Sequence, residues 1–276
     1  MYNLLMVGAD IEVFLRDIKT SKLTPAIGKV GGTKEKPRKI LGDEWSALQE
    51  DNVMLEFNIN PAGNESQWRN NINKVLVFIV EEMREKGYVI DIAPSVIFEP
   101  KDLEDPQARQ MGCDPDMSAW TTLPNELITP EALGNLRTSG GHVHVTFKVQ
   151  SQDPTMVQKL NFIRMLDLAL GVPSVLLDTD ADRRRHYGRA GAFRSKGANH
   201  IEYRALSNFW IKNDDLKEWV YNNVVWATKQ LNSRFGVVKD NLGLELYTHD
   251  VCNCLKNSDT ITARKLIKDL RIPMPE

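Results

Sequence analysis

Cysteine is scarce in this sequence, with three residues among 276. Three thiols cannot form the paired disulfide framework of a small secreted domain. Cys252 and Cys254 form a C-x-C pattern without the second cysteine pair that a structural zinc site would use, and Cys113 stands apart. We therefore expect all three cysteines to be reduced and without zinc.

A basic excess is also missing, because 35 Lys and Arg residues face 37 Asp and Glu residues. This balance disfavours a nucleic-acid coat or an anionic membrane surface as partner. The sequence shows no run of about 18 apolar residues of the kind that a membrane span needs. The first ten residues lack a basic segment and reach an acid too early for a signal peptide. The expectation is a cytoplasmic protein without nucleic-acid or membrane partners.

What is present is an ordinary globular composition, with 42% hydrophobic and 26% charged residues, enough for one domain over residues 1–276. Apolar residues recur at helical spacing in four segments. These expected helices are Ser66–Lys86, Asp153–Leu170, Leu216–Trp226 and Ser258–Leu270. Gly87 and Gly171 are expected to end the first two.

The intervening segments have alternating rather than continuous apolar patterns. Tyr88–Phe98 is rich in β-forming residues and is interrupted by Pro94, which indicates an edge or irregular strand. Alternating strands separated by long helices favour the α+β class with a mainly antiparallel sheet backed by helices. Residues 99–139 contain five prolines, and a loop of this length is often a binding segment. We expect this insertion to face the substrate.

Four separated segments place polar residues at positions i and i+2 within otherwise apolar stretches. They are Val7–Val13, Val53–Asn60, Gly141–Val145 and His200–Arg204. In a β-strand, successive side chains point to opposite faces, so each segment sends its polar side chains to one face. If these strands are neighbours, that face gathers several carboxylates, and two such charges about 4 Å apart repel by roughly 4 kcal/mol at an effective dielectric of 20. The pattern predicts bound cations.

Each acidic pair also has a simpler interpretation. Asp10 and Glu12, taken alone, fit a solvated strand surface better than a ligand set. Glu56 repeats the pattern together with Asn58, for which a turn-capping role is an equal alternative. The cation hypothesis therefore depends on the segments meeting in one sheet.

The remaining two segments add other ligand types. His142 and His144 follow two glycines on one strand face, a pattern frequent in metal sites, although two hydrogen-bonded core histidines would look the same. Glu202 and Arg204 share a face, and an exposed cross-strand ion pair worth at most about 1 kcal/mol is their simpler explanation.

Two polar stretches stand out between these segments. Residues 183–196 hold six arginines or lysines with two glycines, which suits phosphate binding, although a solvated loop would look the same. Residues 29–43 read as a solvated loop because the G-x-x-x-x-G-K-[ST] phosphate motif is absent there. Acids that hold hard cations, combined with arginines that grip phosphoryl oxygens, indicate nucleotide-dependent phosphoryl transfer.

The ordered combination of these motifs resembles the glutamine synthetase and glutamate-cysteine ligase superfamily, and most closely its phage-encoded carboxylate-amine ligases. The motifs that carry the resemblance are Gly8–Glu12, Glu56–Pro61, Gly140–His144, Arg185–Arg194 and Ile201–Arg204. The resemblance implies a curved antiparallel sheet that forms a funnel, with nucleotide entering at one side and the acid and amine substrates at the other. It also implies two or three Mg²⁺ or Mn²⁺ ions that bridge the ATP phosphates.

Site residues follow from the same resemblance. The metal ligands it implies are Asp10, Glu12, Glu56, His142 and Glu202. Arg204 is similar to the arginine that contacts phosphate in the transition state, and Arg189 and Arg194 join it as catalytic candidates. His144, Asn58 and Arg185, together with these three arginines, are candidates for contacts with nucleotide, acyl phosphate or substrate carboxylate.

The resulting hypothesis is an ATP-dependent ligase that joins a small-molecule or peptide carboxylate to an amine through an acyl phosphate. Three alternatives stay open: a phosphotransferase similar to guanidino kinases, a metal-dependent hydrolase that uses His142 and His144, and a non-enzymatic phage binding protein. A phage-encoded protein would act in the host cytoplasm. Assembly into a homo-oligomer is left open.

Overall fold

The structure is a computed structural model that describes residues 1–40, 42, 44–110, 116–126, 128–233 and 242–275. The prediction for Cys113 lies outside the described residues. Cys252 is half-buried, Cys254 is buried, and both carry free thiols. Burial raises the pKa of both thiols, to about 11 and about 12, so these cysteines stay protonated at neutral pH.

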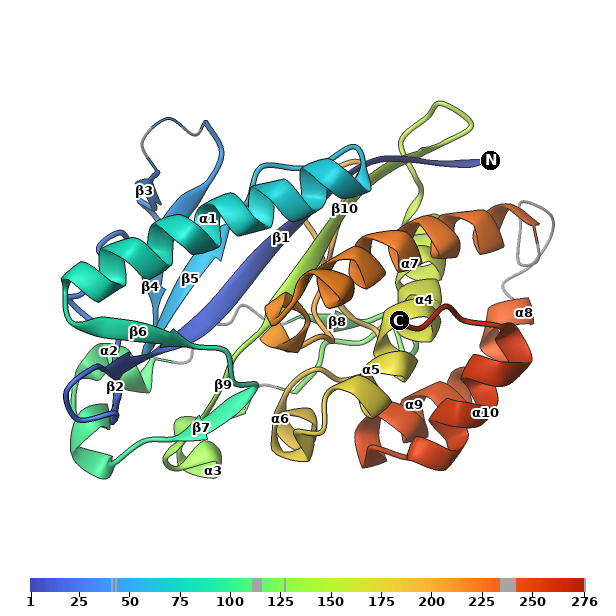
Figure 1. The fold of residues 1–276 in the computed structure, drawn as a ribbon. Coiled ribbons are helices and arrows are strands. Elements are labelled where there is room, and N and C mark those ends of the chain that lie inside the picture. Colours follow the sequence, from blue (N-terminus) through green and yellow to red (C-terminus); the bar gives the residue numbers. More distant parts are fainter. Residues whose placement is uncertain (41, 43, 111–115, 127, 234–241, 276) are drawn as a thin grey trace.

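Strands predominate in the first half of the chain and helices in the second half (Figure 1). The strands are β1 (Tyr2–Asp17), β2 (Leu23–Thr24), β3 (Arg38–Lys39), β4 (Ala47–Asp51), β5 (Met54–Asn58), β6 (Tyr88–Asp91), β7 (Ser95–Ile97), β8 (Met117–Ser118), β9 (Leu136–Thr138), β10 (Gly141–Val149), β11 (Ala192–Ser195) and β12 (His200–Tyr203). The α-helices are α1 (Glu65–Glu85), α2 (Pro106–Arg109), α3 (Pro130–Leu133), α4 (Met156–Leu166), α5 (Val172–Leu177), α6 (Ala181–His186), α7 (Asp214–Ser233), α8 (Leu242–Glu245), α9 (Thr248–Asn257) and α10 (Thr260–Leu270). The described residues also form two 3₁₀-helices, Pro100–Leu103 and Asn208–Ile211, and a π-helix, Asp167–Gly171.

One large sheet has the strand order β3-β4-β5-β1-β10-β12-β11-β8. Strands β2 and β6 pair with the C-terminal end of β1. Every pairing in this sheet is antiparallel. A small second sheet pairs β7 with β9. These pairings confirm the α+β class with a mainly antiparallel sheet, and the long strand β1 crosses the middle of Figure 1.

One face of the sheet is apolar and covered by helices. On β1, the side chains of Val7, Ala9, Ile11 and Val13 are buried, and alternate residues on the neighbouring strands join them in the core. Helices α1 and α7 lie across this face (Figure 1). Because side chains alternate along a strand, Asp10 and Glu12 face the opposite side.

The sequence of helix α1 explains why a helix forms here and packs on the apolar face of the sheet. Asn64 caps it by accepting a hydrogen bond from the Gln67 N–H at 2.9 Å, and Gly87 follows its end with a φ of +88°. Its fully buried side chains recur at helical spacing and are Trp68, Ile72, Val75, Ile79 and Met83. The predicted helix over residues 66–86 is confirmed.

The helix expected to end at Gly171 instead continues through the π-helix into α5. A Cβ on Gly171 would lie 2.7 Å from the Tyr203 hydroxyl, so the glycine here permits close packing rather than termination. The combined helix Met156–Leu177 is long and apolar enough to cross a membrane, which corrects the expectation that no such stretch exists. However, 78% of its most apolar window is buried inside the fold, as in a core helix.

Asp167, within the π-helix, joins three separate segments. Its carboxylate is fully buried and accepts hydrogen bonds from Trp120 Nε1 at 2.6 Å, the Tyr203 hydroxyl at 2.7 Å and the Gly191 N–H. Burial raises the pKa of Asp167 to about 7, although the three donors act against this shift. The carboxylate thereby holds the β8, β11 and β12 region against the helices.

Asp167→Asn is expected to lower the free energy of unfolding by about 2–4 kcal/mol. The amide nitrogen would face buried donors, and at least one of them would lose its acceptor. Denaturant unfolding followed by tryptophan fluorescence measures the change, and Asp215→Asn, which changes an exposed acid in the first turn of α7, is the control. Equal stabilities of the two variants would contradict this role.

The insertion at residues 99–139 is less irregular than expected. Its described part contains a 3₁₀-helix, α2, β8, α3 and β9, each four residues or shorter. Strand β8 extends the large sheet beside β11, and β9 pairs with β7. Short elements of this kind leave no periodic apolar signal in the sequence, because they contain less than two turns of helix or a few strand residues.

Candidate active site

The polar segments meet on the face of the sheet opposite the helices. Between β1 and β5, Asp10 pairs with Asn58 and Glu12 pairs with Glu56. Cross-strand partners have side chains on the same face, with Cβ atoms about 5 Å apart. The predicted convergence of the first two polar segments is therefore present.

The same face continues on the other side of β1. Asp10 pairs with His142 on β10, and His144 pairs with Glu202 on β12. Glu202 in turn pairs with Arg194 on β11. One register thus brings together residues that are almost 200 positions apart in the sequence.

A first group of possible cation ligands consists of Asp10, His144 and Glu202, whose ligand atoms lie within 4.8 Å of one another. His144 Nε2 lies 2.8 Å from Asp10 Oδ2. Burial alone would lower the pKa of His144, but the Asp10 carboxylate raises it above the usual value. The sequence hypothesis placed His142, not His144, among the metal ligands.

A second group consists of Glu12, Asp51 and Glu56, again within 4.8 Å of one another. Burial, and then repulsion from Asp51, raises the pKa of Glu12 to about 7. Burial raises the pKa of Asp51, and burial with repulsion from Asp10 raises the pKa of Glu56 well above its usual value. Three acids that resist ionisation together form a set that a divalent cation would satisfy.

The Glu202 carboxylate is surrounded by cationic side chains of the site. Arg204 Nη1 donates to its Oε1, Lys196 Nζ lies 3.0 Å from Oε2, and Arg194 Nη1 lies 3.9 Å from Oε1. Burial would raise the pKa of Glu202, but Arg204 and then the two histidines hold it well below the usual range. The carboxylate is therefore ionised throughout the physiological pH range.

His142 lies beside both groups and belongs to neither. Its Nδ1 is 3.6 Å from Glu202 Oε1 and 3.3 Å from Arg204 Nη1. Burial, followed by the Arg204 charge, lowers the pKa of His142 well below its usual value, so this imidazole is neutral. A Cβ on Gly140 would lie 2.4 Å from the His142 ring, which explains the glycine before the histidine motif. The role of His142 as a metal ligand stays a prediction.

Two adjacent cavities open on this face and share Glu12, Asp51, His142 and Arg204 in their walls. The larger has an empty volume of about 830 Å³, open solvent at its mouth included, and its other polar wall residues are Asp10, Lys34, Gln49, Glu56, Asn58, Arg194, Lys196 and Glu202. The smaller has an empty volume of about 530 Å³, again with open solvent included, and is lined in addition by Asn52, Met54, Leu133, Arg137–Gly140, Arg183 and Tyr187. Leu133 and Arg137–Ser139 come from the insertion that we expected to face the substrate.

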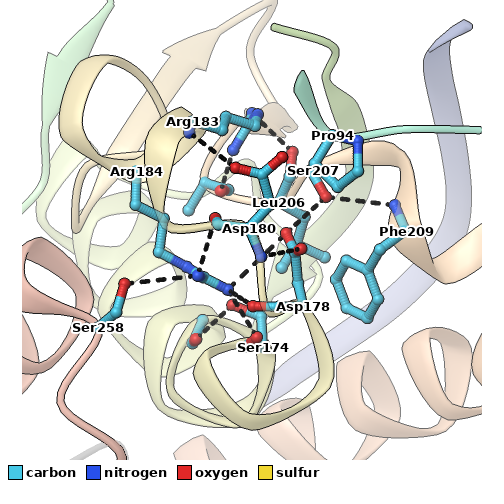
Figure 2. A network of polar contacts seen from close by, with 12 residues as sticks. Pro94, Ser174, Asp178, Asp180, Arg183, Arg184, Leu206, Ser207, Phe209 and Ser258 are labelled. Atoms are coloured by element: carbon cyan, nitrogen blue, oxygen red, sulfur yellow. Dashed lines mark hydrogen bonds and ion pairs between the residues drawn. The ribbon is translucent and has the colours of Figure 1, made fainter. Parts of the chain in front are cut away.

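The basic run at residues 183–196 is not one loop. Arg183 and Arg184 lie on α6 with buried guanidinium groups (Figure 2). Arg183 donates to the carbonyls of Ser139, Ala205 and Leu206 at 2.7–2.8 Å. Figure 2 shows that Arg184 likewise contacts Ser174, Asp178 and Ser258. These two arginines hold backbone segments together.

The other arginines of the run separate into two kinds. Arg194 lines the larger cavity, as Arg204 does. Arg185 is exposed and pairs with Asp182 at 2.8 Å, and Arg189 Nη2 lies 3.8 Å from Glu126. Neither Arg185 nor Arg189 is in the wall of either cavity. The assignments of Arg185 and Arg189 to nucleotide or catalysis stay predictions.

Sequence reasoning missed several residues of this site. Asp51 ends β4, and its alternation with Gln49 was the only signal, because a strand of five residues gives little periodicity. Lys34 comes from the stretch interpreted as a solvated loop. Asp116, from the insertion, accepts a hydrogen bond from Arg204 Nε at 3.3 Å.

The loop that carries Lys34 is anchored to the sheet. The Glu50 carboxylate accepts backbone N–H groups from Gly28, Val30 and Gly31 at 2.9–3.1 Å. A Cβ on Gly32, where φ is +85°, would lie 2.5 Å from the Leu48 carbonyl oxygen. The described part of the loop is therefore fixed against β4, and this position lets Lys34 line the larger cavity.

Two buried atoms support cation binding in the first group. His144 Nε2 and Glu202 Oε2 are inaccessible to solvent and have no partner that meets hydrogen-bond geometry, despite the short contacts to Asp10 and Lys196. A nitrogen lone pair and carboxylate oxygens are ligands that Mn²⁺ and Mg²⁺ accept. The donor set therefore fits the divalent ions that the resemblance implies.

Comparison with known proteins agrees with the sequence motifs. Residues 135–234, somewhat more than a third of the chain, match the family described as "Phage phiEco32-like COOH.NH2 ligase-type 2". The matched part contains His142, His144, Glu202 and Arg204. The resemblance to phage-type carboxylate-amine ligases is confirmed for this part. No protein of curated function matches the sequence.

Solved structures with related architecture are distant. GmaS without ligand and a GmaS/ADP complex each show 11% identity and a TM-score of 0.44. The alignments cover 100% and 98% of this chain and 71% and 69% of those chains, respectively. A bifunctional glutathione synthetase from Pasteurella multocida shows 11% identity and a TM-score of 0.45, with 98% of this chain and 49% of that chain aligned.

Proposed function

We propose, from the premise that residues 135–234 match a COOH.NH2 ligase family, that this protein is an ATP-dependent carboxylate-amine ligase. The observation that carries the proposal is the pair of cavities that share Glu12, Asp51, His142 and Arg204. A ligase must bring a nucleotide phosphate and two organic substrates to one point. Two cavities with a common wall provide that arrangement.

The larger cavity suits the nucleotide phosphates. Lys34, Arg194 and Lys196 supply positive charge to it, and the acids of both ligand groups supply sites for divalent ions. Bound divalent ions would neutralise phosphate charge, and the residues that would hold them are Asp10, His144 and Glu202 in one group and Glu12, Asp51 and Glu56 in the other. Phosphates and carboxylates repel one another, so cations between them are required.

The smaller cavity suits the acid and the amine. Met54, Leu133 and Tyr187 provide apolar surface, while Arg137 and Arg204 are cationic residues in its wall. A carboxylate in this cavity would lie next to Arg204, at the wall shared with the larger cavity. Small-molecule sites commonly combine apolar surface with a few convergent polar groups, and this cavity offers both kinds of lining.

The chemistry proposed for this geometry has two steps. A carboxylate oxygen of the acid attacks the γ-phosphorus of ATP, the bond to the bridging oxygen breaks, and ADP leaves with an acyl phosphate formed. The amine nitrogen then attacks the acyl carbon, inorganic phosphate leaves, and the nitrogen loses a proton to a base. The proposal gives Arg204 the role of stabilising the charge on the transferring phosphoryl group, an electrostatic effect worth several kcal/mol.

The test is a reaction of the purified protein with ATP, Mg²⁺ and pooled acids and amines. We expect equal amounts of ADP and phosphate, and mass spectrometry should detect an amide. Arg204→Gln is expected to lower the rate by about 10²–10³-fold. Arg84→Gln, which changes an exposed arginine on α1 outside both cavities, serves as the matched control and should leave the rate unchanged.

Three outcomes would redirect the assignment. A phosphoramidate with ADP would indicate phosphotransfer, and turnover without nucleotide would indicate a hydrolase. Absence of both nucleotide binding and turnover with every substrate pool would indicate a binding protein.

A further inference from the structure

His200 contacts the first ligand group and has no role in the proposed reaction so far. It is the first residue of β12, and its backbone pairs with Thr146 on β10. Its ring Nε2 lies 2.8 Å from Nδ1 of His144, with the ring centroids 5.0 Å apart and the planes inclined by 50°. The two imidazoles therefore meet through their nitrogen atoms rather than by stacking.

A nitrogen–nitrogen contact of this length requires one proton between the two rings. Each neutral imidazole carries one N–H group and one nitrogen lone pair, so one ring donates and the other accepts. If His144 donates from Nδ1, its Nε2 keeps a lone pair. If His200 donates instead, His144 carries its proton on Nε2, and that atom cannot bind a cation.

The surroundings of His144 Nε2 favour the first arrangement. This buried atom lies 2.8 Å from Asp10 Oδ2, yet the contact does not meet hydrogen-bond geometry. The Glu202 carboxylate supplies the third ligand atom of the same group, and its Oε2, which lies 3.0 Å from Lys196 Nζ, has no contact that meets hydrogen-bond geometry. A proton on Nε2 would point into a space bounded by carboxylates without a well-aligned acceptor, whereas a lone pair there would complete a set of three ligand atoms.

We propose that His200 is a positioning residue that accepts the Nδ1–H of His144 and thereby aims the Nε2 lone pair of His144 at a divalent cation shared with Asp10 and Glu202. The proposal rests on the cation site of the proposed function and adds His200 as the residue that orients the ligand His144. Histidine ligands commonly donate their second N–H to such a partner, and loss of the partner typically lowers metal affinity by about 10–100-fold.

Mn²⁺ affinity without nucleotide, measured by isothermal titration calorimetry, provides the first test. His200→Phe removes the acceptor while keeping a planar ring, and we expect about 10–100-fold weaker binding. His200→Gln retains an acceptor oxygen and should restore most of the affinity. His249→Gln, which changes an exposed histidine on α9, is the matched control and should bind as the unmodified protein does.

The tautomer itself provides a second test that needs no variant. Long-range ¹H–¹⁵N correlation spectra of the protein labelled with ¹⁵N-histidine distinguish the two neutral forms, at a pH above the histidine titration range. We expect His144 to carry its proton on Nδ1. A proton on Nε2 would overturn the proposal, and so would unchanged Mn²⁺ binding in a folded His200→Phe variant.

The outcomes also separate this proposal from the ligase function. Weaker Mn²⁺ binding in His200→Phe, without amide formation by the unmodified protein under any condition, would leave the positioning role intact and remove the ligase. Amide formation by the unmodified protein, together with unaltered Mn²⁺ binding in His200→Phe, would support the ligase function and overturn the positioning role. An unmodified protein that binds no Mn²⁺ would overturn the positioning role directly.

Discussion

Replacing Glu202 with glutamine should lower ATP-dependent turnover by about 10²–10³-fold or more. Glu202 belongs to the first ligand group and contacts Arg204 and Lys196, so the substitution would remove one ligand of the proposed cation and release two cationic side chains. An amide cannot replace the negative charge that organises this part of the site. ADP release at saturating ATP and Mg²⁺ measures the loss.

The controls for this variant separate lost chemistry from lost structure. Glu202 is almost completely buried, so Glu202→Gln is first compared with the unmodified protein by circular dichroism and thermal unfolding. Asp10→Asn, a second member of the same ligand group with a more exposed side chain, should show a loss of similar order. Retained turnover in a folded Glu202→Gln variant would remove Glu202 from the proposed cation site.

Glu12→Gln should make the cation-free protein more stable above pH 7, by up to about 3 kcal/mol. Burial and the neighbouring Asp51 raise the pKa of Glu12 from 4.5 to about 7 in the folded protein. Above that pH the folded protein holds a buried charge among other acids, and glutamine avoids this cost. A stabilising substitution at a conspicuous polar position is the signature of a site built for a ligand rather than for stability.

The sign of the pH dependence follows from proton linkage. Between pH 4.5 and about 7 the folded protein keeps a proton on Glu12 that the unfolded chain releases, so Glu12 contributes stability that is lost as pH rises through this window. Burial lowers the pKa of His142, so His142 lowers the stability of the folded protein as pH falls below its usual pKa. This pH dependence is opposite to that of Glu12. The contribution of Glu12 is therefore measured as the difference between Glu12→Gln and the unmodified protein.

Chemical unfolding at several pH values, with EDTA or with Mg²⁺, measures both effects. Mg²⁺ should stabilise the unmodified protein increasingly as pH rises, because the ion replaces protons on the second ligand group. Glu12→Gln should lose most of this gain. Glu126→Gln, at a side chain that is 89% exposed, is the control. A Glu12→Gln variant that is less stable than the unmodified protein above pH 7 would contradict the role of Glu12.

The sequence alone determined the two faces of the central sheet. Period-two alternation at Asp10 and Glu12, at Glu56 and at the histidine pair is a local property of an extended chain, so it can be read without knowing the neighbours. Helix α1 was equally readable, because its apolar spacing and Gly87 lie within one segment. Strand pairing then required only that the apolar faces share one core.

The tertiary structure alone decided which polar residues share a ligand group. If the register between β10 and β12 shifted by two residues, every side chain would stay on the same face of the sheet. His142 would then lie opposite Glu202 in place of His144. Asp51 and Lys34 reach the site through a short strand and an anchored loop, which leave little periodic pattern. Arg183 and Arg185 look alike in sequence, but helix α6 buries the first and exposes the second. Distances between segments depend on packing, and packing is a property of the whole chain rather than of any one of its motifs.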